Sequence, residues 1–96
     1  MPEEVLFKSE STQSRSDVAA YLRTVADKLE RGEDITLTDG SESVTMSPPA
    51  NPTFEIKAER EGPQGGPKEL SIEFELEWDE NAEAGSSGAG GDLRIE

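Results

Sequence analysis

The fold is decided by one stretch, Glu69-Leu70-Ser71-Ile72-Glu73-Phe74-Glu75-Leu76-Glu77-Trp78. Large apolar side chains occupy every second position, and acidic side chains fill nearly all of the positions between them. Because a strand turns successive side chains to opposite faces, this alternation predicts a strand with one apolar and one acidic face. No other part of the chain offers so much hydrophobic surface in so few residues, so we expect the core to be built on it.

Shorter segments with the same alternation predict further strands, over residues 4–10, 34–38, 43–47 and 53–60. Asp39-Gly40 predicts a hairpin turn, because glycine adopts positive φ freely. Two prolines end the strand that follows, since proline has no amide to donate, and a loose Gly/Pro loop over residues 62–67 closes a second hairpin. We expect this second pairing to place Lys57 and Arg60 among the glutamates, relieving part of their repulsion.

One amphipathic helix is predicted between Ser14 and Gly32. Its apolar stripe recurs at steps of four, three and four residues. Either Ser14 or Ser16 is suited to accept from the exposed amides of the first turn, and Gly32 supplies the left-handed residue that ends a helix.

The predicted fold class is therefore α+β, with one amphipathic helix packed on an antiparallel sheet of about five strands. We expect residues 1–79 to form this domain and residues 80–96 to form a flexible Gly/Ser/acidic tail. The final segment Leu93–Glu96 adds a strand to an open edge or frays, and we favour fraying. The predicted core consists of Val5, Phe7, Val18, Leu22, Val25, Leu29, Ile35, Leu37, Val44, Met46, Phe54, Ile56, Leu70, Ile72, Phe74, Leu76 and Trp78.

The chain is strongly acidic, with 22 acidic against 9 basic residues and a formal net charge of −13. A nucleic-acid mimic or a partner of basic proteins is one interpretation of this charge. The second interpretation is a surface that is adapted to molar salt and covered by salt cations. Carboxylates are spread over every predicted element, which favours this interpretation. In molar salt the Debye length is about 3 Å, so the charges repel each other little.

Composition also excludes several classes of chemistry. The chain contains no cysteine and no histidine, so disulfides, thiol nucleophiles, Cys/His zinc sites and histidine proton relays are excluded. No apolar run approaches the length of a membrane span, and the N-terminus lacks a signal-peptide pattern, so we expect a cytoplasmic location and no membrane partner.

The remaining candidates for chemistry are carboxylates on the predicted solvent face, namely Glu73, Glu75 and Glu77, or Glu55 with Glu75. On that face desolvation cannot raise a carboxyl pKa far towards the range of a general acid, which favours a solvated surface over catalysis. A β ladder also lacks the looped carbonyls of a tight calcium site, and no basic stripe exists for nucleic acid. We predict no catalytic residue, no cofactor and no specific metal site.

The order of these elements resembles the amphi-Trp domain, a small family found largely in halophilic archaea. The resemblance covers about residues 5–78, in particular the helical segment Ala26-Asp27-Lys28-Leu29-Glu30-Arg31-Gly32 and the acidic alternating strand that ends at Trp78. The tail after Asp79 and the Pro48–Pro52 segment depart from the pattern. The resemblance implies a halophilic protein and carries over no catalytic residue.

We therefore expect a non-enzymatic interaction or self-association module, with a homodimer or a protein partner. The alternative is a small-molecule or nucleotide-binding regulatory domain, which requires a concave pocket with converging polar groups. Trp78 either caps the core or anchors an interface, because tryptophan is enriched at binding hot spots. The candidate interface residues are Trp78, Leu93 and Ile95.

Overall fold

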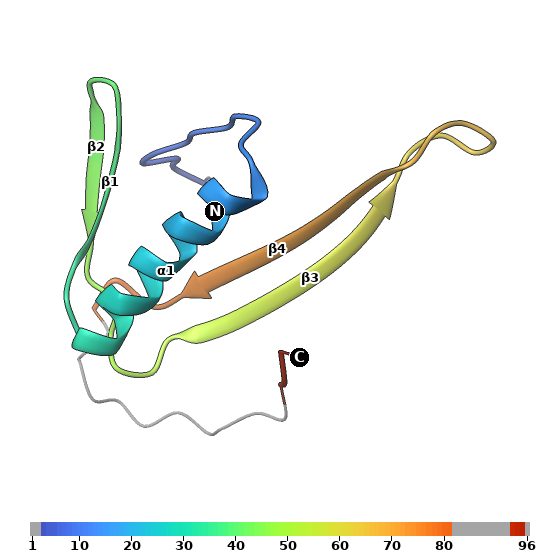
Figure 1. Cartoon of the computed structure of the whole chain (residues 1–96). Helices are drawn as coiled ribbons and strands as arrows, with labels where there is room; N and C mark the ends of the chain where they lie inside the picture. Colours follow the sequence, from blue (N-terminus) through green and yellow to red (C-terminus); the bar gives the residue numbers. More distant parts are fainter. Residues whose placement is uncertain (1–2, 82–92, 96) are drawn as a thin grey trace. The chain divides into compact units, whose positions relative to one another are not determined.

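The structure is a computed structural model that describes residues 3–81 and 93–95 (Figure 1). The chain divides into two compact units, residues 1–48 and 49–96, and each is described by itself. The first contains the helix α1 (Arg15–Arg31) and the strands β1 (Ile35–Asp39) and β2 (Glu42–Met46), while the second contains β3 (Thr53–Glu61) and β4 (Glu69–Glu77). The predicted α+β class is confirmed.

Helix α1 begins and ends at the residues that the sequence predicts. The Oγ of Ser14 accepts a hydrogen bond from the Asp17 amide at 3.0 Å, so Ser14 rather than Ser16 caps the helix. At the other end Gly32 has φ 68°, and its amide donates to the Leu29 carbonyl at 3.2 Å. The helix therefore satisfies exposed backbone groups at both ends with its own neighbours.

The hairpin β1–β2 is antiparallel and closes through Gly40, whose φ is 62°. Its register pairs Ile35 with Met46 and Leu37 with Val44, which places the four apolar side chains on one face. On the other face the hydroxyls of Thr36 and Thr45 are 2.9 Å apart across the strands.

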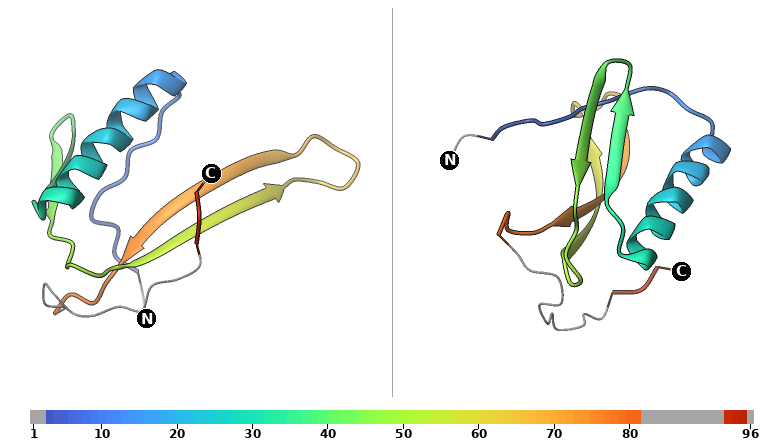
Figure 2. Two further views of the ribbon diagram at one scale, coloured as in Figure 1. Left: turned by 60° about the horizontal axis from the view of Figure 1, so that its bottom comes forward. Right: turned by 90° about the vertical axis from the view of Figure 1, so that its left-hand side faces the viewer.

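The hairpin β3–β4 is longer, with nine residues in each strand. Its register runs from Thr53 opposite Glu77 to Glu61 opposite Glu69. Figures 1 and 2 show the two strands side by side as a curved, twisted ribbon. The Nζ of Lys68 donates to the carbonyl oxygens of Gly62, at 3.2 Å, and of Pro63, so the loop that we expected to be loose is held by its own side chain.

The single sheet of about five strands is not confirmed. The described residues form two separate two-stranded sheets, and the strand predicted for residues 4–10 is absent. Alternation alone does not make a strand, because a strand also needs a partner for its backbone amides and carbonyls, and residues 4–10 pair with none in the described part of the chain. Residues 93–95 likewise form no strand, and most of the predicted tail lies outside the described residues.

The predicted core is wrong in its degree of burial, because none of its side chains is buried. Two-stranded sheets have nothing of their own to cover an apolar face, so alternation leaves that face open. Half-buried are Phe7, Val25, Ile35, Val44, Met46, Ile56, Leu76 and Trp78, and exposed are Val5, Val18, Leu22, Leu29, Leu37, Phe54, Leu70, Ile72 and Phe74. No helix in the described residues is long and apolar enough to cross a membrane.

Replacing Ser14 with alanine removes the acceptor for the Asp17 amide. We expect Ser14→Ala to lower the free energy of unfolding by about 1 kcal/mol, measured by thermal unfolding followed by circular dichroism. Ser16→Ala is the matched control, because Ser16 lies inside the helix and does not cap it. Equal losses in both variants would contradict this assignment of the cap.

Replacing Gly62 with alanine strains the β3–β4 loop. Gly62 has φ 151°, and a Cβ built on it would lie 2.7 Å from the Pro67 carbonyl oxygen. We expect Gly62→Ala to destabilise the protein by roughly 1–3 kcal/mol. Gly65→Asn is the control, because Gly65 has open space around it and asparagine tolerates positive φ. A smaller loss in Gly62→Ala than in Gly65→Asn would overturn the argument.

Candidate interaction surface

The β3–β4 hairpin sorts its side chains onto two chemically different faces. Its register pairs apolar side chains with one another and glutamates mainly with polar groups. The apolar face is widely open, with exposed fractions of 73% at Leu70, 68% at Ile72 and 51% at Phe74. We call this face the apolar hairpin face; it consists of Phe54, Ile56, Ala58, Leu70, Ile72, Phe74 and Leu76.

Two stacked aromatic rings lie on the apolar hairpin face, towards the end that is away from the loop. The rings of Phe54 and Phe74 are stacked, with centroids 6.4 Å apart and an interplanar angle of 10°. Phe74 lies opposite Ile56, so the stacked pair is a diagonal neighbour pair across the ladder. Such contacts are worth about 0.5–1.5 kcal/mol beyond the burial of area, and they hold both rings in place while leaving them accessible.

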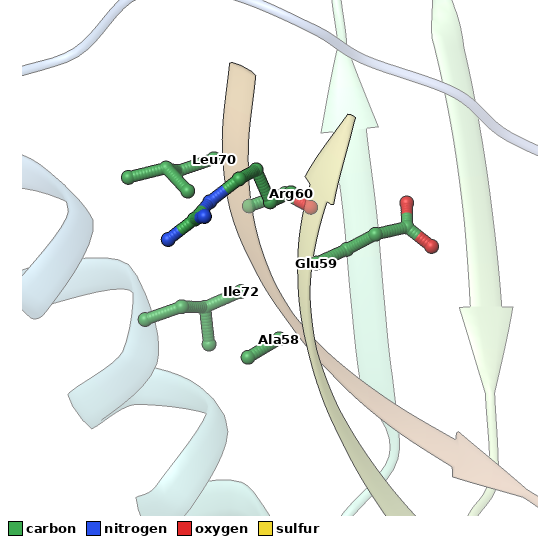
Figure 3. A pocket seen from close by; sticks show the side chains of 6 residues that line it. Ala58, Glu59, Arg60, Leu70 and Ile72 are labelled. Atoms are coloured by element: carbon green, nitrogen blue, oxygen red, sulfur yellow. The ribbon is translucent and has the colours of Figure 1, made fainter. Parts of the chain in front are cut away.

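Arg60 lies on the apolar hairpin face rather than on the acidic one, which corrects the prediction. It is opposite Leu70 at the loop end of the hairpin, in step with the apolar residues of β3. Figure 3 shows Arg60, Leu70, Ile72 and Ala58 projecting on one side and Glu59 on the other. These residues line an open hollow together with Ser71. Its lining is mainly apolar, and its polar groups come from Glu59, Arg60 and Ser71. Because the hollow is open and Glu59 projects to the other side, these groups do not converge as they do in a small-molecule pocket.

The opposite face is the acidic hairpin face, which carries the glutamates of both strands. Glu55 lies directly opposite Glu75, and Glu61 directly opposite Glu69. Like charges in this position are unfavourable. Carboxylate oxygens of Glu55, Glu75 and Glu77 all lie within 4.8 Å of one another, and all three side chains are exposed. The two pairings confirm that acids outnumber bases on this face.

This crowding changes the pKa of Glu75. The negative charge of Glu77, above all, raises the pKa of Glu75 above its ordinary value, with smaller contributions from partial desolvation, a hydrogen bond with Glu77 and the charge of Glu73. Lys57 has the reverse surroundings. Its ammonium group is 3.3 Å from Glu59, and the hydrogen bond and charge of Glu59 raise the pKa of Lys57 above its ordinary value.

Of the carboxylates that the sequence offered for chemistry, Glu55, Glu75 and Glu77 are brought together in an exposed position, whereas Glu73 lies opposite Lys57. Glu55, Glu75 and Glu77 are the only group of three or more acids in the described residues with ligand atoms close enough to share a cation. An exposed carboxylate on a ladder keeps its water, so the arrangement suits weak, exchangeable cations better than a tight site.

The predicted interface residues occupy two places. Trp78 directly follows β4, is half-buried, and lines an open hollow with Thr53, Glu77 and Asp79 at the end of the hairpin away from its loop. Leu93 and Ile95 are exposed and belong to no helix or strand. The sequence pattern assigned Leu70, Ile72 and Phe74 to the core and did not predict that they lie on the surface. Their alternation did place them correctly on one face.

The family comparison covers the whole chain. The model of the Amphi-Trp domain family matches residues 1–96, a wider range than the resemblance in sequence pattern suggested. No curated protein and no solved structure matches the chain.

The raised pKa of Glu75 has a definite consequence for stability. A folded-state pKa above the unfolded value means that the folded protein binds more protons between those two values, so stability falls as pH rises through that window. The loss is complete at neutral pH. We therefore expect Glu75→Gln to raise the melting temperature at pH 7 and low salt, with no gain below the ordinary carboxyl range.

The control for Glu75→Gln is Glu59→Gln, which removes one charge from the same face. Glu59 is paired with Lys57, so its removal costs a favourable contact and we expect no rise in melting temperature. Both measurements are thermal unfolding at several pH values, in low salt and in multimolar KCl, where screening shrinks the gain from Glu75→Gln. Equal gains in the two variants would mean that net charge, not neighbouring charge, is responsible.

Proposed function

We propose that this chain, which belongs to the Amphi-Trp domain family, is a non-enzymatic interaction module that binds through its apolar hairpin face. The observation that carries this proposal is the exposure of Leu70, Ile72 and Phe74 on one continuous face. Contiguous apolar surface of this kind is uncommon on a small monomer and marks interaction sites.

The alternative of a small-molecule or nucleotide-binding domain has weaker support. The hollow beside Arg60 is open and lined mainly by alkyl groups, and a ligand pocket encloses most of its ligand. An interaction module, by contrast, requires an exposed apolar patch or a free strand edge. The second unit offers both, because β3 and β4 pair only with each other in the described residues.

We further propose that the module works in the cytoplasm of a cell with high internal salt. The net charge of −13 and the opposed pairs Glu55–Glu75 and Glu61–Glu69 support this. Molar salt screens these repulsions, and loosely held cations then occupy the acidic hairpin face.

The experiment that tests the interaction surface is a polar replacement on it. In the double variant Leu70→Gln, Ile72→Gln the replaced side chains are both more than two-thirds exposed. We expect the melting temperature of the dilute chain to remain unchanged while binding is lost. Native mass spectrometry of the tagged chain recovered from a high-salt lysate of its source cells measures which species stay bound.

The matched control for the double variant is Val5→Gln, because Val5 is 72% exposed and lies in the other unit. It removes a similar apolar side chain and should leave the bound species in place. If the double variant retains every bound species, the proposal is wrong. It is equally wrong if the variant is strongly destabilised at every concentration, because the face then serves the chain's own folding.

A further inference from the structure

The two ends of the apolar hairpin face differ in charge. Arg60 is the one charged residue in step with the apolar positions of β3 and β4, and it lies at the loop end, opposite Leu70. At the other end, β4 is followed directly by Trp78 and then by Asp79. A cation therefore stands at one end of the face, and an aromatic ring with a carboxylate stands at the other.

A second copy of the chain complements this arrangement if it is turned end for end. A two-fold axis that lies between the two packed faces, perpendicular to the strands, would bring Arg60 of each copy to the Trp78 end of the other. A guanidinium over an indole is a favourable cation–π contact, and Asp79 adds an opposite charge beside it. The reverse arrangement, with like ends together, would set two guanidinium groups against each other.

The size of the face also fits a second copy, at the weak end of the range. Phe54, Leu70, Ile72 and Phe74 have exposed fractions of 41%, 73%, 68% and 51%. With large side chains of about 150–250 Å² each, this is on the order of 500 Å² per copy and roughly 1,000 Å² per pair. Stable complexes bury about 1,200–2,000 Å², so the expected dimer is concentration-dependent.

Charge sets the conditions under which the copies associate. Each chain carries a net charge of −13, so two copies repel each other in dilute buffer. In face-to-face packing the acidic hairpin faces point away from each other, and salt screens what repulsion remains. A dimer held by apolar contacts therefore strengthens as salt is added, unlike one held by surface ion pairs.

Resting on the function proposed above, we infer that the partner of the apolar hairpin face is a second copy of this chain, packed face to face and end for end. Arg60 of each copy then lies against Trp78 and Asp79 of the other.

The test uses the absence of cysteine from the chain, so that introduced thiols are unique. Arg60→Cys and Asp79→Cys are made in separate chains that differ in tag mass, mixed in multimolar KCl and oxidised. Within one copy the two thiols lie far apart. Thr53 is the β3 residue nearest Trp78, and it is seven residues, about 23 Å, from position 60 along the strand. Thiols at positions 60 and 79 therefore come together only between copies. We expect the mixed 60–79 disulfide to exceed the 60–60 and 79–79 products.

Two controls accompany the disulfide test. Glu59→Cys lies on the acidic hairpin face and should not form the mixed disulfide with Asp79→Cys. Sedimentation equilibrium of the unmodified chain should show a dimer that grows with KCl, and the Leu70→Gln, Ile72→Gln variant should stay monomeric. Predominant 60–60 and 79–79 products would overturn the end-for-end arrangement.

The failure of this inference and that of the proposed function are distinguishable. If the unmodified chain is monomeric at every salt concentration yet retains another protein that the double variant loses, the second copy is wrong and the interaction module stands. If the chain is monomeric and the double variant retains whatever the unmodified chain retains, both are wrong.

Discussion

The antiparallel register of β3 and β4 is the constraint on which the rest of the second unit depends. Because Phe54 lies opposite Leu76 and Glu55 opposite Glu75, apolar side chains gather on one face and carboxylates on the other. The stacking of the two phenylalanines follows from this pairing, whereas the raised pKa of Glu75 comes mainly from Glu77, two residues further along the same strand. Slipping the register by one residue would set apolar side chains against carboxylates and break the stacked pair.

Added salt acts differently on the two faces of the hairpin. On the acidic hairpin face, added salt weakens the repulsion between carboxylates such as Glu55 and Glu75. On the apolar hairpin face the attraction is mainly between uncharged side chains, so the same salt leaves most of it intact. A hairpin of this composition therefore gains from concentrated salt on its acidic face and keeps its attraction on its apolar face, so dilute buffer is the condition least suited to it.

Sequence patterns predicted the local structure well and the tertiary environment poorly. Helix α1, its cap at Ser14 or Ser16, its end at Gly32 and both hairpins follow from spacing and turn chemistry, which act within a few residues. The strand expected over residues 4–10 failed because pairing depends on a partner distant in sequence. Burial failed for the same reason, since alternation assigns Leu70 to a face but does not say what covers that face.

The sequence predicted which apolar residues share the candidate surface, but it did not predict that this surface is exposed. The alternation identified every apolar residue of the face, and it also placed Arg60 there, because residue 60 is in step with Phe54 and Ile56. Assigning Arg60 to the acidic face followed charge rather than position. The sequence left two interpretations of Trp78 open, a cap on the core and an anchor of an interface. In the structure Trp78 is half-buried, which lies between the two.

The strict two-residue period of β3 and β4 also limits how the lengths of these strands change in evolution. A single inserted residue would turn every later side chain over, moving glutamates onto the apolar hairpin face, unless a bulge absorbed it. Two inserted residues keep both faces intact and only lengthen them. Homologous chains should therefore differ by even numbers of residues within these strands, and odd differences should gather in the loop that Lys68 closes.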